Sequence, residues 1–318
     1  MQYLVSDNSI QDAFPHSLWV SSLFVVIVLV IIYFAAHAFL LREYPSPAFL
    51  PFSEAKTHAT STHETAQPAS LHYTFSHDGV LEETGSPENS TSPYFWLNSG
   101  GMLLIHDGIG ETIEGSTLPL SYWRMRYAAS NPLDTDSGRY PQNLFRLISK
   151  GTWDDVVESL QFKLNKTNLT DTPNRDGYSG VLLMSRYQDA MNLYYAGLRM
   201  DGTAVIKKKY RGTYYTLAER QVFAGAEGYD RTTNPNLIPQ GIWMGLRSET
   251  RTREDGSVMI SLWIDKAATG TWEEILTALD TKGANGTDTI DGPAHAGIRT
   301  DYLDVQFDTY DIHEVTGL

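Results

Sequence analysis

Alternating carboxylates are the first residues in this sequence whose types and spacing could do chemistry. Asp134 and Asp136 alternate in the loop Asp-Thr-Asp-Ser-Gly, and carboxylate oxygens at this spacing are typical ligands of calcium. The loop lacks the distal Glu that completes an EF-hand, so a solvated turn is the alternative. Asp308, beside a slip in a strand pattern, is a further candidate ligand. Calcium is therefore a hypothesis, and the sequence requires no cofactor.

Carboxylates for glycoside hydrolysis are harder to find. The two groups must lie about 5–5.5 Å apart for retention or about 6.5–9.5 Å apart for inversion. On one strand such a pair stands two or four residues apart, because alternate side chains share a face. Glu111 and Glu114 are three residues apart, so on one strand their side chains would lie on opposite faces. Asp304 and Asp308 have a suitable spacing, but the expected bulge would turn them apart.

Other nucleophiles are also missing from the sequence. The chain has no Cys, which excludes thiolate catalysis, disulfides and Cys-ligated metal sites. It has no Gly-x-Ser-x-Gly motif for a serine hydrolase. These patterns favour a binding protein over an enzyme, and a glycoside hydrolase or a lyase is the alternative.

Aromatic and polar side chains form two candidate surfaces for a carbohydrate. A flat ring can stack on the apolar face of a pyranose while neighbouring polar groups bind its hydroxyls. Trp123 and Tyr127 alternate onto one face of an expected strand, Ser121–Tyr127. The second surface surrounds a turn in the middle of the chain and comprises Arg186, Asp189, Asn192 and Tyr194. Core packing is the alternative for each aromatic ring, and a purely structural role in the turn is the alternative for the polar residues.

The elements that would position these residues centre on a three-stranded meander, Gly180–Gly212. Val181–Arg186, Leu193–Arg199 and Thr203–Tyr210 read as short strands with period-two alternation. Asp201-Gly202 between two such runs is a strong hairpin signal, because the turn needs residues that tolerate positive φ. The basic run Lys207-Lys208-Lys209 lies in the third strand, where alternate residues face opposite sides. We expect a charged sheet edge there rather than a binding patch.

The rest of the chain after residue 94 shows short apolar segments broken by turns every eight to twelve residues. Such spacing predicts a β-sandwich or barrel. The last segment, Tyr302–His313, changes phase after Phe307, and a β-bulge near Asp308 would explain the change. An aromatic content of 12% also favours β structure. A formal net charge of −14 argues against nucleic acid as the main partner.

The N-terminal part has a different character. Residues 1–17 form a short polar tail, and residues 18–41 are a nearly unbroken apolar run, long enough to cross a membrane as one helix. Residues 42–93 are rich in Pro, Ser and Thr, which predicts a flexible stalk. Arg42 is the basic residue nearest the apolar run and points by the positive-inside rule to a cytoplasmic C-terminal part. Large domains cross membranes largely regardless of flanking charge, so we expect residues 94–318 to lie outside.

Three stretches in the expected order carry a resemblance to a known family. They are Arg186–Asp189 followed by Asn192–Tyr195, then Trp243–Glu249, and finally Ala296–Thr300 followed by Val305–Asp308. Together they resemble concanavalin A-like lectin/glucanase domains, with the laminin-G-like and keto-disaccharide-hydrolase-like relatives that are common in bacterial surface proteins. The resemblance spans about residues 95–318. It implies a jelly roll of two antiparallel sheets that holds glycans or peptides on a concave face or its rim, sometimes with calcium.

The sequence thus predicts an all-β, antiparallel two-sheet jelly-roll sandwich preceded by one N-terminal transmembrane helix. The expected function is that of a membrane-anchored, extracytoplasmic module that binds a glycan or another cell-envelope component. A glycan-active hydrolase of the keto-disaccharide type or a polysaccharide lyase is the alternative.

Overall fold

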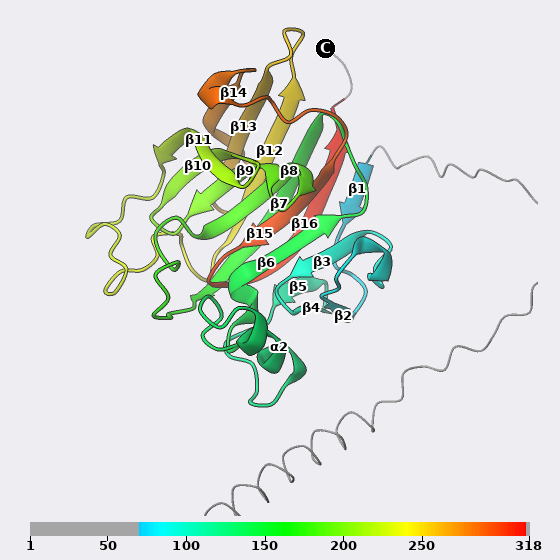
Figure 1. Cartoon of the computed structure of the whole chain (residues 1–318). Coiled ribbons are helices and arrows are strands. Elements are labelled where there is room, and N and C mark those ends of the chain that lie inside the picture. Colours follow the sequence, from blue (N-terminus) through cyan, green and yellow to red (C-terminus); the bar gives the residue numbers. More distant parts are fainter. Residues whose placement is uncertain (1–69, 316–318) are drawn as a thin grey trace, which may run out of the picture. The chain divides into compact units, whose positions relative to one another are not determined.

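The computed structural model describes residues 70–315, which form two antiparallel β-sheets packed face to face (Figure 1). The nine-stranded sheet contains β14 (Glu273–Asp280), β13 (Val258–Asp265), β12 (Trp243–Thr252), β7 (Val156–Thr167), β16 (Leu303–Glu314), β5 (Ile109–Thr112), β4 (Met102–His106) and β2 (Gly79–Glu82), with β1 (Ser70–Tyr73) paired to β16. The seven-stranded sheet contains β11 (Thr213–Gln221), β10 (Thr203–Tyr210), β9 (Asn192–Arg199), β8 (Gly180–Asp189), β15 (His295–Thr300), β6 (Phe145–Ser149) and β3 (Phe95–Ser99).

Within residues 70–315 helical structure is confined to short segments between strands. They are η1 (Pro87–Asn89), α2 (Tyr122–Ser130), η2 (Pro141–Leu144) and η3 (Ala284–Gly286). Among residues 70–315 no helix is long and apolar enough to cross a membrane. The expected transmembrane helix, residues 18–41, lies outside the described residues and stays a prediction. The antiparallel two-sheet sandwich is confirmed.

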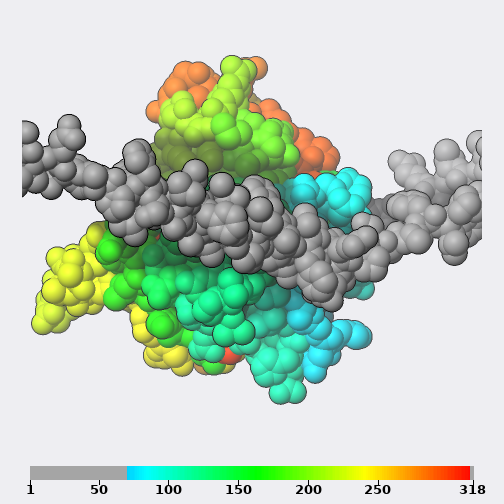
Figure 2. All heavy atoms as spheres, turned by 60° about the horizontal axis from the view of Figure 1, so that its bottom comes forward, coloured from blue at the N-terminus to red at the C-terminus, as the bar shows by residue number. Residues whose placement is uncertain are grey.

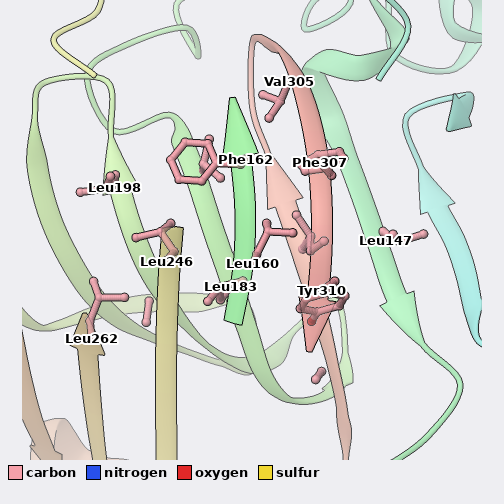
Figure 3. Close-up of a cluster of buried hydrophobic side chains, with 14 of the residues drawn as sticks. Leu147, Leu160, Phe162, Leu183, Leu198, Leu246, Leu262, Val305, Phe307 and Tyr310 are labelled. Carbon is pink, nitrogen blue, oxygen red and sulfur yellow. The ribbon is translucent and has the colours of Figure 1, made fainter. Parts of the chain in front are cut away.

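The core lies between the two sheets and follows the period-two alternation of the strands. Leu160 and Phe162 of β7 and Val305 and Phe307 of β16 point into it from the nine-stranded sheet (Figure 3). The opposing sheet contributes alternate residues of β8 and β9, among them Leu183 (Figure 3). Burial of this apolar surface is the main favourable term for the fold, at about 25 cal/mol per Å².

The central meander forms as expected from the sequence. β8, β9 and β10 are consecutive neighbours in the seven-stranded sheet. Gly202 makes the second turn with a φ of 78°, a conformation that favours glycine. The bulge in β16 is confirmed as well, because the pairing with β7 shifts register between Asp308 and Tyr310. Thr309, the residue between them, has a φ of 43°.

The expected strand Ser121–Tyr127 is wrong, because these residues begin α2. Ser121 is the N-cap, and its hydroxyl accepts a hydrogen bond from the backbone N–H of Arg124 at 3.4 Å. Trp123 and Tyr127 are four residues apart, a spacing that shares a face in a helix as well as in a strand. Both side chains are buried beneath the helix. The pattern alone could not separate the two structures over so short a segment.

Strands β1 and β2 fall within the range 42–93 that the composition assigned to a stalk. β1 pairs with β16 from Ser70 opposite His313 to Tyr73 opposite Tyr310, and Phe75 is buried in the core. Residues from Ser70 onwards therefore belong to the sandwich. The rest of the predicted stalk lies outside the described residues.

A buried ion pair joins the two sheets at the end of β10. Lys208 Nζ donates to both carboxylate oxygens of Asp280 at 2.8 Å, and both side chains are fully buried. The hydroxyl of Tyr194 donates to the same carboxylate at 2.7 Å. The three groups satisfy one another, whereas any one of them alone would be costly in the core.

We expect Lys208→Met to lower the free energy of unfolding by about 3–5 kcal/mol, because it leaves the Asp280 carboxylate buried without its cation. Urea denaturation would measure the change. Lys209→Met is the matched control, since Lys209 is the next residue and projects from the opposite face of β10. The double variant Lys208→Met/Asp280→Asn should recover part of the loss. Equal midpoints for Lys208→Met and Lys209→Met would contradict this account of the pair.

A second buried carboxyl group, Glu158, has no cationic partner among the described residues. It follows the alternation of Leu160 and Phe162 into the core, where its Oε2 accepts a hydrogen bond from the Tyr310 hydroxyl at 2.7 Å. Burial raises the pKa of Glu158 well above its ordinary value, and the Tyr310 hydrogen bond offsets this only in part. The neutral form therefore stabilises the fold.

Glu158→Gln should become progressively more stable than the parent chain as pH rises. The stabilisation from protonated Glu158 is complete below the pKa of the unfolded chain and is lost as pH rises through the raised folded-state pKa. Gln has no such titration, so the difference in free energy of unfolding should grow as pH rises above about 4.5, the ordinary pKa of Glu. Urea denaturation across this range would test it, with exposed Glu227→Gln as the control. A difference that does not change with pH would show that Glu158 does not titrate in this way.

Candidate functional site

A cavity of about 620 Å³ lies on the outer face of the seven-stranded sheet. Its floor comes from β9, β10 and β15, with Tyr195, Lys207 and Arg299 among the lining residues. Its rim comes from loops that are distant in sequence, including Tyr178 before β8 and Asp134 after α2. We call this cavity the tyrosine groove. Three tyrosine side chains line it together with Lys207 and Arg299: Tyr178, Tyr195 and Tyr214. We call this part of the groove its cationic end.

The strand period explains which residues reach the groove. Leu183, Tyr194 and Ile206 face the core, whereas Leu182, Tyr195 and Val205 belong to a second apolar cluster on the outer face. Lys207 stands opposite Tyr195 in the pairing of β10 with β9, so the two residues share the outer face. The groove therefore lies on a partly apolar surface with polar groups at its ends.

Aromatic rings form one wall of the tyrosine groove. The rings of Tyr195 and Tyr214 stack with centroids 6.1 Å apart and planes 24° apart. Tyr178 is 61% exposed, and the guanidinium of Arg199 lies 4.0 Å from its ring centroid. The ammonium of Lys207 lies 5.1 Å from the same centroid. These cation–π contacts hold an exposed ring in place at the rim.

Arg299 organises the floor. Its Nε donates to both carboxylate oxygens of Asp301 at 2.9 and 3.0 Å, and its Nη1 donates to the hydroxyl of Tyr195 at 2.8 Å. Burial lowers the pKa of Arg299, but Asp301 together with Tyr195 and Tyr214 more than offsets this, and the pKa lies above its ordinary value. Burial raises the pKa of Tyr214. Arg299 and Lys209 together lower this pKa by more than burial raises it, so the net shift is downward. The floor is a fixed array of donors and acceptors with excess positive charge nearby.

Asp134 marks the opposite, acidic end of the groove. Its Oδ1 accepts hydrogen bonds from Asn174 Nδ2 at 2.6 Å, from the Tyr302 hydroxyl at 3.1 Å and from Thr172 at 3.3 Å. Asp136, its partner in the calcium hypothesis, instead pairs with Arg139 at 3.3 Å. The carboxylate at this end is thus held by neutral donors.

The described residues do not form a set of ligands for the predicted calcium ion. Among residues 70–315 there is no group of three or more His, Cys, Asp or Glu side chains placed to hold a metal ion. Asp308 lies at the bulge of β16 and accepts a hydrogen bond from Thr309 at 3.1 Å, so it does not complete a site with Asp134 and Asp136. Calcium stays a sequence-based prediction.

The rim loop between β7 and β8 is clamped by two arginines. Arg231, from the loop between β11 and β12 that projects from the sandwich (Figures 1 and 2), donates to the carbonyls of Arg175 at 2.7 Å and Thr172 at 2.6 Å. Arg175 donates in return to the carbonyls of Thr170 at 3.0 Å and Arg231 at 3.1 Å. These bonds satisfy backbone acceptors of an irregular loop and fix the segment that carries Tyr178.

The six residues predicted to bind a glycan lie elsewhere. Trp123 and Tyr127 are buried beneath α2, and Tyr194 is buried in the core with Asp280. Asp189 accepts hydrogen bonds from the backbone N–H of Met191 at 2.6 Å and from Asn192 Nδ2 at 3.1 Å, so Asp189 and Asn192 close their own turn. Arg186, the sixth, is buried as well. None of the six lines the tyrosine groove.

The groove residues were harder to see in the sequence. Tyr195 follows Tyr194, and alternation alone places one of the two rings outside the core. Tyr178 and Asp134 come from two separate connections and Arg299 comes from β15, and no local spacing joins them. The one sequence signal for Tyr178 and Asp134 is their place in loops, which often carry binding residues.

Arg186 is a structural residue with partners that the sequence did not indicate. Its buried guanidinium donates to Asp155 Oδ1 at 3.0 Å, to Thr252 Oγ1 at 2.6 Å and to the carbonyl of Ile290 at 2.8 Å. Within residues 70–315 Arg186 forms no ion pair with Asp189, because β8 has a bulge between Ser185 and Asp189 and the φ of Arg186 is 47°. The side chain therefore turns away from the β8–β9 turn and joins both sheets.

No family model and no curated protein matches the chain. Among solved structures it is similar to the carbohydrate-binding module CBM66 from Bacillus subtilis, at 15% identity, with 52% of this chain and 78% of that chain covered and a TM-score of 0.35. It is also similar to a prokaryotic β-1,3-1,4-glucanase (lichenase) derived from a mouse hindgut metagenome, at 10% identity, covering 77% and 99%, with a TM-score of 0.40. A third is the Ca²⁺-bound exoplasmic/lumenal domain of VIP36, at 9% identity, covering 79% and 91%, with a TM-score of 0.37.

At such identities and TM-scores the likeness carries no argument about the fold family or the ligand of this chain. The resemblance to concanavalin A-like lectin/glucanase domains therefore stays a prediction from the sequence.

We expect Arg186→Ala to lower the free energy of unfolding by about 3–5 kcal/mol, because it leaves the Asp155 carboxylate without its cation and the carbonyl of Ile290 without its donor. Thermal unfolding followed by circular dichroism would measure the loss. Arg211→Ala is the matched control, since Arg211 has nearly the same φ, 48°, but is exposed. Similar melting temperatures for the two variants would disprove the structural role of Arg186.

Proposed function

We propose that this chain is a glycan-binding protein and that the tyrosine groove is its binding site. The observation that carries the proposal is the exposed Tyr178 ring, fixed beside the stacked pair of Tyr195 and Tyr214 above the Arg299–Asp301 pair. A ring at the rim offers a flat apolar surface to a pyranose, and the fixed polar groups offer partners to its hydroxyls. The cavity volume, about 620 Å³, suits a short oligosaccharide.

Hydrolysis is disfavoured by the way in which the groove uses its carboxylates. A glycosidase needs one protonated acid and one free carboxylate across the scissile bond. Here Asp301 is held by Arg299, Asp134 accepts three neutral donors, and Asp176 accepts the backbone N–H of Tyr178 at 2.8 Å. Each carboxylate is positioned as an acceptor, which is a binding role. A hydrolase of the keto-disaccharide type or a lyase is the alternative, and the release of reducing or unsaturated ends would reveal it.

The setting that we propose for this module comes from the sequence. Residues 18–41 would anchor the chain in the cell membrane, a stalk from residue 42 would follow, and the sandwich would lie outside the cytoplasm. A laminin-G-like module displayed in this way would bind a glycan or another cell-envelope component. The acidic loop at Asp134 and Asp136 would be the place for a calcium ion if one takes part.

Tyr178→Ala should weaken glycan binding about tenfold, which corresponds to about 1.4 kcal/mol, because it removes the stacking surface at the rim. Affinity electrophoresis of the full chain against a panel of polysaccharides would first find a retained polymer and then compare variants on it. Tyr122→Ala is the matched control, because Tyr122 is also 61% exposed but lies on α2, outside the groove. Equal retention of both variants would place the binding site elsewhere, and turnover of the polymer would favour the enzyme alternative.

A further inference from the structure

Lys207 brings a positive charge into the tyrosine groove without a carboxylate to neutralise it. The residue is partly buried on the outer face of β10 and lines the cavity. In the part of the chain that the structure describes, no Asp or Glu oxygen lies within 4.0 Å of its Nζ. Its Nζ lies 5.1 Å from the centroid of the Tyr178 ring. An uncompensated cation in a cavity is available to an incoming anion.

The neighbouring arginines differ from Lys207 because their charges are already paired. Arg199 pairs with Asp201 and with Glu219, the latter at 3.1 Å. Arg299 pairs with Asp301 through Nε and bonds to tyrosine hydroxyls through Nη1. Within residues 70–315 the Nη2 group of Arg299 donates to no protein acceptor. Arg299, a lining residue, therefore has a free N–H donor in addition to the Lys207 ammonium.

Two lysines stand near this end of the groove without an ion pair among the described residues. The chain carries a formal net charge of −14, yet Lys207 lines the groove and Lys209 lies over the Tyr214 ring, 4.7 Å from its centroid. Burial lowers the pKa of Lys207 and the positive charges of Arg199 and Arg299 lower it further, whereas Tyr214 and Glu219 raise it, and the net shift is downward. The charge on Lys207 is therefore unfavourable in the free protein, and a bound anion would relieve this cost.

The fold does not require a lysine at this position. Lys208 is the residue of the basic run that serves the core, where it pairs with Asp280. Lys207 points the opposite way and contributes no ion pair to the described structure. A charge that has no ion pair in the described structure, placed in a cavity beside a guanidinium donor, has the arrangement of a receptor for a negatively charged group.

We propose that the tyrosine groove binds saccharides that bear an anionic group, a carboxylate or a sulfate, and that Lys207 contacts this group. This inference rests on the proposed function and names the class of its ligand. The sugar ring would lie against Tyr178, with its anionic substituent between Lys207 and Arg299. The neutral hydroxyls of the saccharide would face the acceptors at the Asp134 end.

Two matched pairs of polymers test the proposal with the full chain in a mild detergent. Polygalacturonate and its methyl ester share a backbone and differ in the carboxylate, and dextran sulfate and dextran differ in the sulfate. We expect affinity electrophoresis to show retention by at least one charged polymer that is about tenfold stronger than by its neutral partner, and to weaken with added salt. The pair that shows the difference identifies carboxylate or sulfate as the group bound.

Lys207→Met then assigns the contact. It should weaken retention on the charged polymer about tenfold, close to the level of the neutral partner, because it removes the charge and keeps the length of the side chain. Lys166→Met, on the exposed side of β7 in the other sheet, is the control and should bind like the parent chain. Both variants should unfold at the same urea concentration as the parent, since neither lysine has an ion pair in the described structure.

The outcomes separate this inference from the proposed function. Equal retention of charged and neutral polymers that is sensitive to Tyr178→Ala would sustain glycan binding and overturn the anionic class. Retention of a charged polymer that is unaffected by Lys207→Met would overturn the role of Lys207. Parallel loss of retention in Lys207→Met and Lys166→Met would point to non-specific charge attraction and overturn it as well. No retention of any polymer, here or in the wider panel, would overturn both proposals.

Discussion

The alternation of side chains along β9 and β10 is the constraint on which both the core and the groove depend. Tyr194 and Lys208 are paired across these strands and point inward, where both bond to Asp280. Tyr195 and Lys207 are the next pair and point outward into the groove. A slip of one residue would turn Tyr195 and Lys207 toward the core and Tyr194 and Lys208 toward the groove, so the alternation decides which tyrosine and which lysine each face receives. The buried pair of Lys208 and Asp280 lies on the inner face of the strand whose outer face carries Lys207.

A buried ion pair lies between the sheets on the inner side of these strands. Such a pair is weak evidence for stability, since the loss of hydration of two charges can exceed their attraction. The same carboxylate also accepts the Tyr194 hydroxyl, so three elements, β9, β10 and β14, meet at one point. These hydrogen bonds satisfy the buried carboxylate, and one cluster thus holds the inner side of the strands whose outer face carries the groove.

The sequence predicted well those features that depend on near neighbours. The β8–β10 meander, the Asp201-Gly202 turn and the bulge after Asp308 all follow from period-two patterns and turn chemistry within about ten residues. It was wrong about Ser121–Tyr127, because a spacing of four residues fits one face of a helix as well as of a strand. It also took Asp189 and Asn192 as binding residues, although an Asp followed closely by an Asn commonly closes its own turn.

The groove could not be predicted in the same way, because it depends on contacts between distant segments. Tyr178, Tyr214 and Arg299 come from a loop, an edge strand and a strand that follows 85 residues after Tyr214. Only the packing of β15 beside β8 brings Arg299 to the outer face near Tyr195. Arg186 shows the same limit in the core, since its partners Asp155, Thr252 and Ile290 lie 31 to 104 residues away.

The way in which the groove is held favours recognition over catalysis. The rim loop is fixed by Arg175 and Arg231 through backbone carbonyls, and the floor is fixed by the Arg299–Asp301 pair. A site that is ordered before the ligand arrives loses little conformational entropy on binding, so modest contacts suffice for affinity. Proton transfer would instead need an acid or base that is free to gain and lose its proton next to the ligand. The carboxylates of this groove are already engaged as acceptors, whereas Lys207 and the ring of Tyr178 remain open to a ligand. The groups left open are those that stack and attract, which is the chemistry of a binding site.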